Sequence, residues 1–307
     1  MSKLAYVFPG QGSQKVGMLE DAKTALAPTF AEASAVLDYD LWALVQDGPA
    51  EKLDQTEFTQ PALLAASVGL WRLALEKGTP VPEVVAGHSL GEYSALVAAS
   101  VLQFSDAVSL VSKRGRLMQN AVPVGEGGMA AVLGLGDEEV KAVCSECSGV
   151  VEAANFNTPG QVVIAGQTRA LEVASKACKQ AGAKRALPLA VSAPFHSSLM
   201  RPAADLMAGA LADVTFATPQ IRIVQNVDAD YCDEPESIRN NLVRQMYSAV
   251  LWSDTIRRIA ADGISMIVEC GPGMVLSGFN RRIEKSLASY SVNSLDSLDS
   301  LLDEVSM

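Results

Sequence analysis

The chain has 307 residues, 49% of them hydrophobic and 19% charged, and its formal net charge at pH 7 is −11. This composition excludes a disordered chain and predicts a globular protein with a large core. The acidic surplus argues against nucleic acid as a partner, because phosphates repel such a chain. No apolar run reaches the roughly 20 residues that cross a bilayer, so we expect no membrane partner.

The N-terminal segment predicts a strand at residues 4–8 and no export signal, because a Pro-Gly turn follows too soon. We therefore expect a cytoplasmic protein. The five cysteines are odd in number and scattered, so they predict no disulfide framework. Cys144 and Cys147 form a lone C-x-x-C pair without a second pair or nearby histidines. We expect them to pack within a helix and to bind no metal.

Strands and helices alternate through the first 120 residues. Helices are expected at residues 20–37 and 60–77, and a second strand at residues 82–87. This alternation is typical of a mostly parallel sheet covered by helices.

The second strand runs into Gly87-His88-Ser89-Leu90-Gly91, and a helix-forming segment follows. A Gly-x-Ser-x-Gly match alone often arises by chance, but a strand before it and a helix after it predict a nucleophile elbow. There the chain turns sharply, with a strained backbone, and exposes the Ser89 hydroxyl at the head of a helix. The N–H of Leu90 is then expected to stabilise an oxyanion. The glycine-rich loop at residues 9–14 either supplies a second such N–H or is a plain turn.

The next expected helix, at residues 105–120, carries an arginine on its apolar stripe. Apolar positions recur at helical spacing, and Arg114 fills the gap between them. A buried guanidinium needs a partner. Arg114 therefore either forms a salt bridge with a core carboxylate or binds the carboxylate of a substrate, which would indicate a dicarboxylic acyl group.

Residues 123–193 change character and follow the order β-α-β-β-α-β, which is typical of a ferredoxin-like unit. We interpret them as a subdomain inserted into a larger α/β core formed by residues 1–122 and 194–307. In the second part of the core, helices are expected at residues 197–212, 236–247 and 252–262, and strands at 221–227 and 264–269. The polar tail after Tyr290 is expected to be frayed or loosely packed.

A serine nucleophile needs a general base, and histidine is the usual one. The chain has only two histidines. His88 directly precedes Ser89, and on a sharp turn its ring should point away from the hydroxyl. His196 is therefore the expected base unless a lysine or carboxylate serves. Its orienting partner stays open, because Asp205, Glu269 and other aspartates and amides are all eligible.

Several motifs together resemble one family, the malonyl-CoA:acyl carrier protein transacylases, from one end of the chain to the other. In chain order they are Phe8-Pro9-Gly10-Gln11-Gly12-Ser13-Gln14, Gly87-His88-Ser89-Leu90-Gly91, Arg114-Gly115, Asn155-Phe156-Asn157-Thr158-Pro159-Gly160-Gln161, Ala193-Pro194-Phe195-His196 and Glu269-Cys270-Gly271-Pro272-Gly273. The resemblance implies a hydrolase-like α/β core with a ferredoxin-like insert.

The resemblance also implies a ping-pong acyl transfer in fatty acid biosynthesis. Ser89 takes malonyl from coenzyme A and passes it to the phosphopantetheine thiol of acyl carrier protein. His196 would act as base and then acid, and Arg114 would bind the malonyl carboxylate. Gln11 and Leu90 would supply the oxyanion N–H groups.

Three further positions match the family. Gln245 corresponds to a glutamine that orients the histidine in place of a triad acid, and Asn155 and Asn157 lie near the pantetheine and acyl end. Phe195, before the histidine, fits malonyl as the acyl group.

The implied partners are malonyl-CoA, coenzyme A and acyl carrier protein, with no permanently bound cofactor and no metal, and we expect a monomer. Acyl carrier protein is acidic, so a local basic site is needed, either at Lys184-Arg185 or at Arg281-Arg282 with Lys285. The alternatives are a serine hydrolase or thioesterase on the same Ser–His pair, an acyltransferase of a polyketide pathway, and a non-catalytic module that binds carrier protein.

Overall fold

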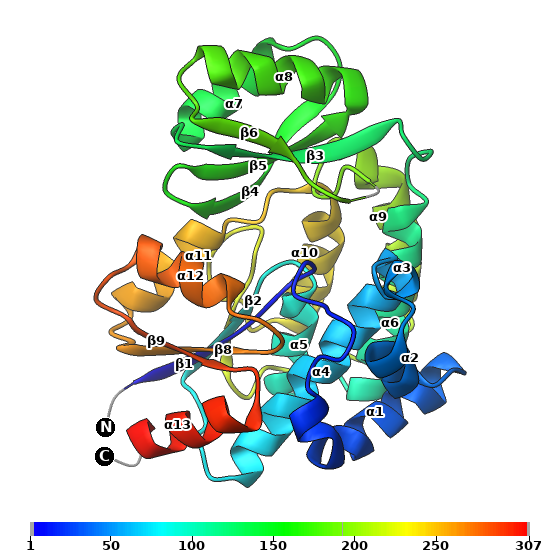
Figure 1. The fold of residues 1–307 in the computed structure, drawn as a ribbon, viewed down its shortest axis with the longest axis vertical. Helices are drawn as coiled ribbons and strands as arrows, with labels where there is room; N and C mark the ends of the chain where they lie inside the picture. The colour runs from blue at the N-terminus through cyan, green and yellow to red at the C-terminus, as the bar shows by residue number, and fades with distance from the viewer. Residues whose placement is uncertain (1–2, 192, 306–307) are drawn as a thin grey trace.

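A computed structural model describes residues 3–191 and 193–305. Figure 1 shows two layered units, a larger α/β core and a smaller antiparallel sheet above it that carries two helices on its outer face. The predicted fold class is confirmed.

The core is built on a five-stranded sheet in the order β7-β2-β1-β8-β9, in which all neighbours are parallel. Its strands are β1 (Leu4–Phe8), β2 (Val84–Gly87), β7 (Arg222–Val224), β8 (Met266–Cys270) and β9 (Ala288–Val292). In a parallel sheet the carboxyl ends of the strands meet at one edge, and the loops that leave this edge build the site.

Helices and 3-10 turns surround this sheet. They are η1 (Glu20–Ala22), α1 (Lys23–Leu37), α2 (Leu41–Asp47), α3 (Ala50–Leu53), α4 (Thr56–Glu76), α5 (Gly91–Ala98), α6 (Phe104–Gln119), η2 (Ser198–Met200), α9 (Arg201–Ala212), α10 (Pro235–Tyr247), α11 (Trp252–Ala261), α12 (Val275–Ile283) and α13 (Leu295–Val305). No described helix combines the length and hydropathy needed to cross a lipid bilayer.

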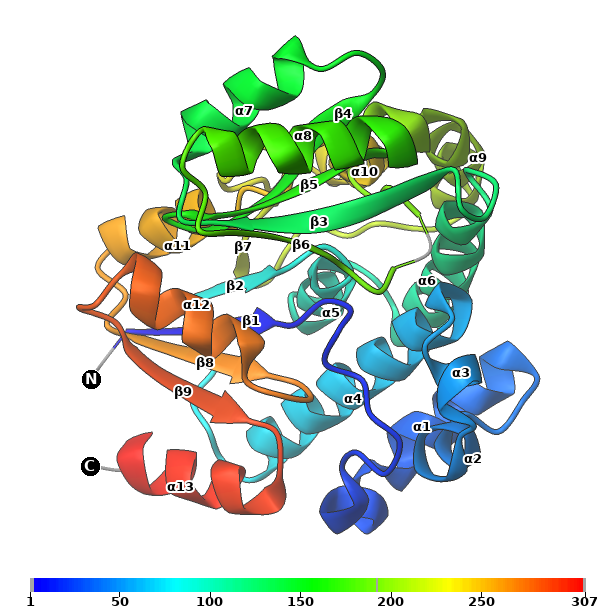
Figure 2. The ribbon, with the colours of Figure 1, turned by 45° about the horizontal axis from the view of Figure 1, so that its top comes forward.

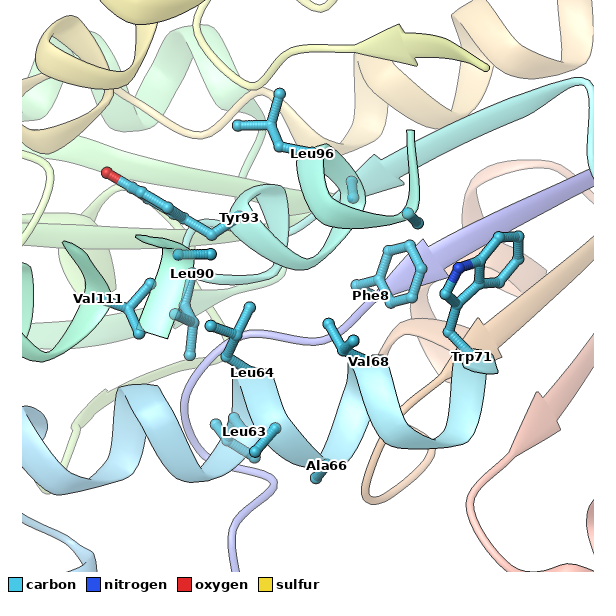
Figure 3. Packing of buried hydrophobic residues seen from close by; sticks show 14 of the residues in the cluster. Phe8, Leu63, Leu64, Ala66, Val68, Trp71, Leu90, Tyr93, Leu96 and Val111 are labelled. Carbon is cyan, nitrogen blue, oxygen red and sulfur yellow. The ribbon is translucent and has the colours of Figure 1, made fainter. Parts of the chain in front are cut away.

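The core strands are covered on both faces, which explains why they are apolar throughout. Tyr6 and Phe8 of β1 point to one face, where Trp71 of α4 packs edge-on against both rings. Ala5 and Val7 point to the other face and join the cluster that contains α11 and part of α12. Figure 3 shows the first of these faces, with Phe8, the apolar side of α4 and the start of α5 in one packed layer.

The smaller sheet has the order β4-β5-β3-β6 and is antiparallel throughout, as a ferredoxin-like βαββαβ unit requires. Its elements are β3 (Gly127–Leu133), α7 (Asp137–Glu146), β4 (Val151–Thr158), β5 (Gln161–Gln167), α8 (Thr168–Gln180) and β6 (Arg185–Pro188). Both helices lie on the same face of this sheet, away from the core (Figure 2), and they bury an apolar cluster of their own.

We propose residues 123–193 as the insert and residues 1–122 and 194–307 as the core. The chain leaves the core after α6 and re-enters it shortly before η2, which supports these boundaries. Residues 1–2, 192 and 306–307 of these ranges lie outside the described residues.

The prediction of a loosely packed C-terminal tail was wrong. After Tyr290 the chain completes β9, which pairs parallel with β8, and then forms α13. Leu298 and Leu301 of α13 are each only 1% exposed and join the core cluster. The leucines of α13 recur at helical spacing and form one buried apolar stripe, but the serines and aspartates between them make the segment look polar.

Candidate active site

Ser89 lies between the end of β2 and the start of α5, on a strained turn. Its φ is 51°, in the left-handed region that a serine rarely adopts. The flanking glycines allow this turn, because a Cβ on Gly91 would lie 2.1 Å from the Phe8 carbonyl oxygen and a Cβ on Gly87 would lie 1.9 Å from the carbonyl carbon of Gly91. The predicted strained elbow is confirmed.

The imidazole of His196 contacts the Ser89 hydroxyl. His196 comes from the loop before η2, is 5% exposed, and places Nε2 at 2.7 Å from Ser89 Oγ. Its Nδ1 lies 2.8 Å from the backbone carbonyl oxygen of Gln245. A carbonyl only accepts, so Nδ1 carries the proton and Nε2 is free to accept one from the hydroxyl. Burial, and next to it the charge of Arg114, lower the pKa of His196 to about 3, so the ring is neutral at pH 7.

Gln245 contacts the imidazole with its main chain and not, as the interpretation as a triad amide implies, with its side chain. The side-chain amide instead bridges two other groups. Its Nε2 donates to the Ser89 carbonyl oxygen at 3.0 Å, and its Oε1 accepts from Arg114 Nη2 at 2.8 Å. One residue at the end of α10 therefore fixes the histidine, the arginine and the elbow.

Arg114 is fully buried, at 0% exposure, on α6. Its Nη1 donates to Gln60 Oε1 at 3.0 Å, and its Nη2 donates to Ser89 Oγ at 3.2 Å. No carboxylate among the described residues forms a salt bridge with it, and its Nε is buried without a hydrogen-bond partner. The structural salt bridge considered above is therefore not found in the described part of the chain, and a cation with spare donors faces the hydroxyl.

The loop after β1 runs beside the elbow. A Cβ on Gly10 would lie 2.6 Å from the His88 carbonyl oxygen, so the two turns touch through their backbones. Neither the N–H of Gln11 nor that of Leu90 has an acceptor among the described residues. Two free N–H donors on adjacent turns suit an oxyanion.

His88 does not compete for the hydroxyl. Its Nε2 lies 2.8 Å from Asn157 Oδ1, and its ring packs against Trp252 with centroids 5.5 Å apart. This agrees with its predicted place as support for the turn.

Two pockets open beside the elbow. His88, Asn155 and Asn157 line one of about 170 Å³, together with Gln11 and residues of α12. A second pocket of about 620 Å³ also includes Gln11 and lies against α3 and the start of α4. Gln11 and Leu189 line both pockets, so both lie next to the loop after β1.

Comparison with known proteins decides the family. The sequence profile described as acyl transferase domain matches residues 5–295. A "Malonyl CoA-acyl carrier protein transacylase" of Salmonella typhimurium is 52% identical over 99% of this chain and 100% of its own. The chain belongs to this transacylase family.

Solved structures agree with this assignment. An acyl carrier protein S-malonyltransferase from Vibrio cholerae has a TM-score of 0.96 and 54% identity, and the match covers 98% of this chain and 100% of the other. A malonyl-transacylase solved in complex with its type II PKS acyl-carrier protein has a TM-score of 0.97 and 52% identity, covering 99% and 100%. The resemblance drawn from the sequence motifs is confirmed.

In this transacylase, sequence reasoning missed Gln60, Glu92 and Asn226, which are all fully buried close to Ser89. Gln60 holds Arg114. Asn226 follows β7, whose neighbour in the sheet is β2. Its place just after a predicted strand could therefore have indicated that it lies at the same edge of the sheet as Ser89. Nothing in the sequence shows that Glu92 is buried, because a glutamate in the first turn of a helix is usually exposed. Within residues 3–191 and 193–305, no three His, Cys, Asp or Glu side chains gather to hold a metal ion.

Proposed function

We propose that this chain transfers malonyl from malonyl-CoA to the phosphopantetheine thiol of acyl carrier protein through an ester on Ser89. The family makes it a malonyltransferase, and the proposal concerns the residues that carry the reaction. One observation carries it: Ser89 Oγ lies 2.7 Å from His196 Nε2 and 3.2 Å from Arg114 Nη2. Nucleophile, base and a cation for a second carboxylate therefore meet at one atom.

In the first half-reaction His196 Nε2 takes the hydroxyl proton as Ser89 Oγ attacks the thioester carbonyl carbon. The N–H groups of Gln11 and Leu90 stabilise the oxyanion. The bond to sulfur breaks, the protonated His196 returns the proton to the leaving thiolate, and coenzyme A departs. The Gln245 carbonyl oxygen, 2.8 Å from Nδ1, stabilises the transient imidazolium.

The second half-reaction runs the same steps in reverse. His196 removes the proton from the phosphopantetheine thiol, whose sulfur attacks the ester carbonyl carbon, and the released Ser89 oxygen takes the proton back. Asn155 and Asn157 line the pocket of about 170 Å³ beside the elbow, which supports their role in holding the pantetheine arm.

Arg114 selects the acyl group. A malonyl carboxylate that replaces the contact to Ser89 Oγ meets a guanidinium already held by Gln60 and Gln245. A planar fork with spare donors suits bidentate binding of a carboxylate.

Carrier protein docking needs a basic surface on a chain with a net charge of −11. Both predicted groups, Lys184 with Arg185 and Arg281 with Arg282 and Lys285, include exposed residues. We favour the second, because Arg281 and Arg282 belong to α12, which also lines the pocket of about 170 Å³.

Fatty acid biosynthesis is the proposed pathway, and polyketide assembly is the second candidate, favoured by the relative solved with a type II PKS carrier protein. We also propose a cytoplasmic monomer without a permanent cofactor. In support of the compartment, the five cysteines are unpaired, as in a reducing environment.

Initial-rate kinetics with malonyl-CoA and carrier protein that bears phosphopantetheine test the proposal. Parallel double-reciprocal lines are expected, because coenzyme A leaves the enzyme before carrier protein reacts with the ester on Ser89. Intersecting lines would contradict a covalent intermediate. Release of malonate without carrier protein, at the rate of transfer, would support the hydrolase alternative instead.

A further inference from the structure

The turn at Ser89 is held by a side chain from outside the motif. Asn226 Oδ1 accepts from the Ser89 N–H at 2.7 Å, and Asn226 Nδ2 donates to the Gly87 carbonyl oxygen at 2.6 Å. One amide therefore bridges both sides of the elbow. A φ in the left-handed region persists only where the surroundings fix it.

Asn226 is in turn fixed by Glu92, which is 0% exposed on the first turn of α5. The backbone N–H of Asn226 donates to Glu92 Oε2 at 2.8 Å, and Gln225 Nε2 donates to Glu92 Oε1 at 3.1 Å. Glu92 forms no salt bridge among the described residues. Both carboxylate oxygens thus accept from the segment after β7, and the side-chain amide of Gln245 also donates to this carboxylate.

The hydrogen bonds that lead from Arg244 to Glu92 all run in one direction, from donor to acceptor. Arg244 Nη1, which can only donate, bonds to Asn241 Oδ1 at 2.8 Å, and Asn241 Nδ2 donates to Gln225 Oε1 at 2.7 Å. Gln225 must therefore present its Nε2 to Glu92. The chain of amides ends at Glu92, where only an acceptor for two donors completes it.

We propose that Glu92 is a positioning residue for the acyl transfer: by accepting from Gln225 and from the Asn226 backbone, it holds the Asn226 amide that keeps Ser89 on its strained turn. The inference rests on the proposed function of Ser89 as nucleophile. It assigns to the glutamate that follows Gly91 a task other than helix formation.

Glu92→Gln tests this direction of donation, because it keeps the shape and replaces one acceptor oxygen with an NH₂ group. That group faces another donor, either Gln225 Nε2 or the Asn226 N–H, and turning Gln225 over to relieve this costs the bond between Asn241 and Arg244. The free-energy cost of a buried donor left without an acceptor corresponds to a factor of roughly 10–100 in an equilibrium or rate constant. We expect the rate of malonyl loading, in a single turnover, to fall by about that factor, with the Kd for malonyl-CoA changed less than about threefold.

The exchange Glu92→Gln with Gln225→Glu is the sharper variant. The new amide at position 92 then donates to the new carboxylate at position 225 and accepts from the Asn226 N–H. The same carboxylate accepts from Asn241, so all partners are satisfied again. We expect this double variant to load malonyl within about threefold of the wild type. Gln225→Glu alone places two carboxylates face to face and is expected to be slow.

Glu269→Gln is a matched control, since Glu269 is also 0% exposed and accepts two backbone N–H groups, at 3.1 and 2.7 Å, but those groups belong to α12 and not to Asn226 or Ser89. It measures how much stability is lost when a buried carboxylate is replaced by an amide. We expect it to lower the Tm, and any slowing of loading that it causes through α12 is the baseline against which the slowing by Glu92→Gln is compared.

The outcomes separate the two proposals. If the wild type loads no malonyl, the proposed function fails. If the wild type loads, and Glu92→Gln loads at the same rate or the double variant is no faster than Glu92→Gln, the positioning role is overturned. Where Glu92→Gln does not fold, the double variant is compared with Gln225→Glu alone: it should load malonyl faster than Gln225→Glu, and equal rates would overturn the positioning role.

Discussion

Replacing Arg114 with alanine should separate charged from uncharged acyl groups. In the free enzyme this guanidinium holds Gln60 and Gln245 and touches the nucleophile, and we propose that the malonyl carboxylate pairs with it. Acetyl-CoA carries the same thioester without that carboxylate. The variant therefore tests the pairing and leaves the chemistry at Ser89 as an internal reference.

The expected magnitude follows from burial. Arg114 is 0% exposed, so a malonyl carboxylate bound without it would be a buried charge with no partner, which costs roughly 3–5 kcal/mol, or roughly 10²–10⁴ in rate. Losing the contacts to the two glutamines slows both acyl groups, by about 1–3 kcal/mol for each oxygen left unpaired. The ratio of malonyl to acetyl loading should therefore fall by at least about 100-fold.

Single-turnover loading, followed as release of coenzyme A from each thioester, measures that ratio. Arg114→Lys is the matched control, because it keeps the charge and loses the fork, and we expect an intermediate ratio. An unchanged ratio in Arg114→Ala, with both acyl groups slowed equally, would refute carboxylate binding by Arg114 and leave it a structural residue.

Three further predictions follow from the structure. Burial lowers the pKa of both His88 and His196, the latter to about 3 with help from a nearby guanidinium, so neither ring should titrate near 6.5 in an NMR titration of labelled protein. At these two rings the unfolded chain then binds more protons, so they lower the free energy of unfolding as the pH drops below 6.5. Burial raises the pKa of Glu92 to about 7 and also raises that of Glu269, and these two carboxyls act in the opposite direction. The titration of the rings is therefore the test, and a ring that protonates at its usual pKa would contradict the prediction. Gly91→Ala should lower the free energy of unfolding in urea by more than about 3 kcal/mol, since its Cβ would lie 2.1 Å from a backbone oxygen. Gly209→Ala, whose Cβ would meet nothing within 4 Å, should raise it by about 1 kcal/mol. Equal effects would show that the close approach at Gly91 is not needed. Leu298→Ala should lower stability by about 2–4 kcal/mol, because this side chain is 1% exposed, and a loss below about 0.5 kcal/mol would show that α13 is loosely attached.

Much of the site could be predicted from the sequence because its signals are local or scarce. The elbow lies within five residues between a strand and a helix, and a chain with two histidines leaves little choice of base. Arg114 stood out as a charge on an apolar stripe. Each of these features constrains the chemistry without any knowledge of distant contacts.

The rest depends on contacts that leave no side-chain signal. Gln245 orients the imidazole with its carbonyl, a group that every residue has, so its side-chain type points to a different contact from the one observed. Asn226 and Glu92 lie 134 positions apart in the sequence, and only the parallel pairing of β2 with β7 brings them together. The leucine spacing of α13 was hidden by its serines and aspartates.

Mass spectrometry after mixing with malonyl-CoA alone gives the most direct test of an ester on Ser89. One malonyl group per chain is expected on the peptide that contains Ser89. It should be absent from Ser89→Ala and removed by carrier protein that bears a free phosphopantetheine thiol. Transfer to carrier protein by Ser89→Ala at the wild-type rate, or an adduct on another residue, would contradict an ester on Ser89.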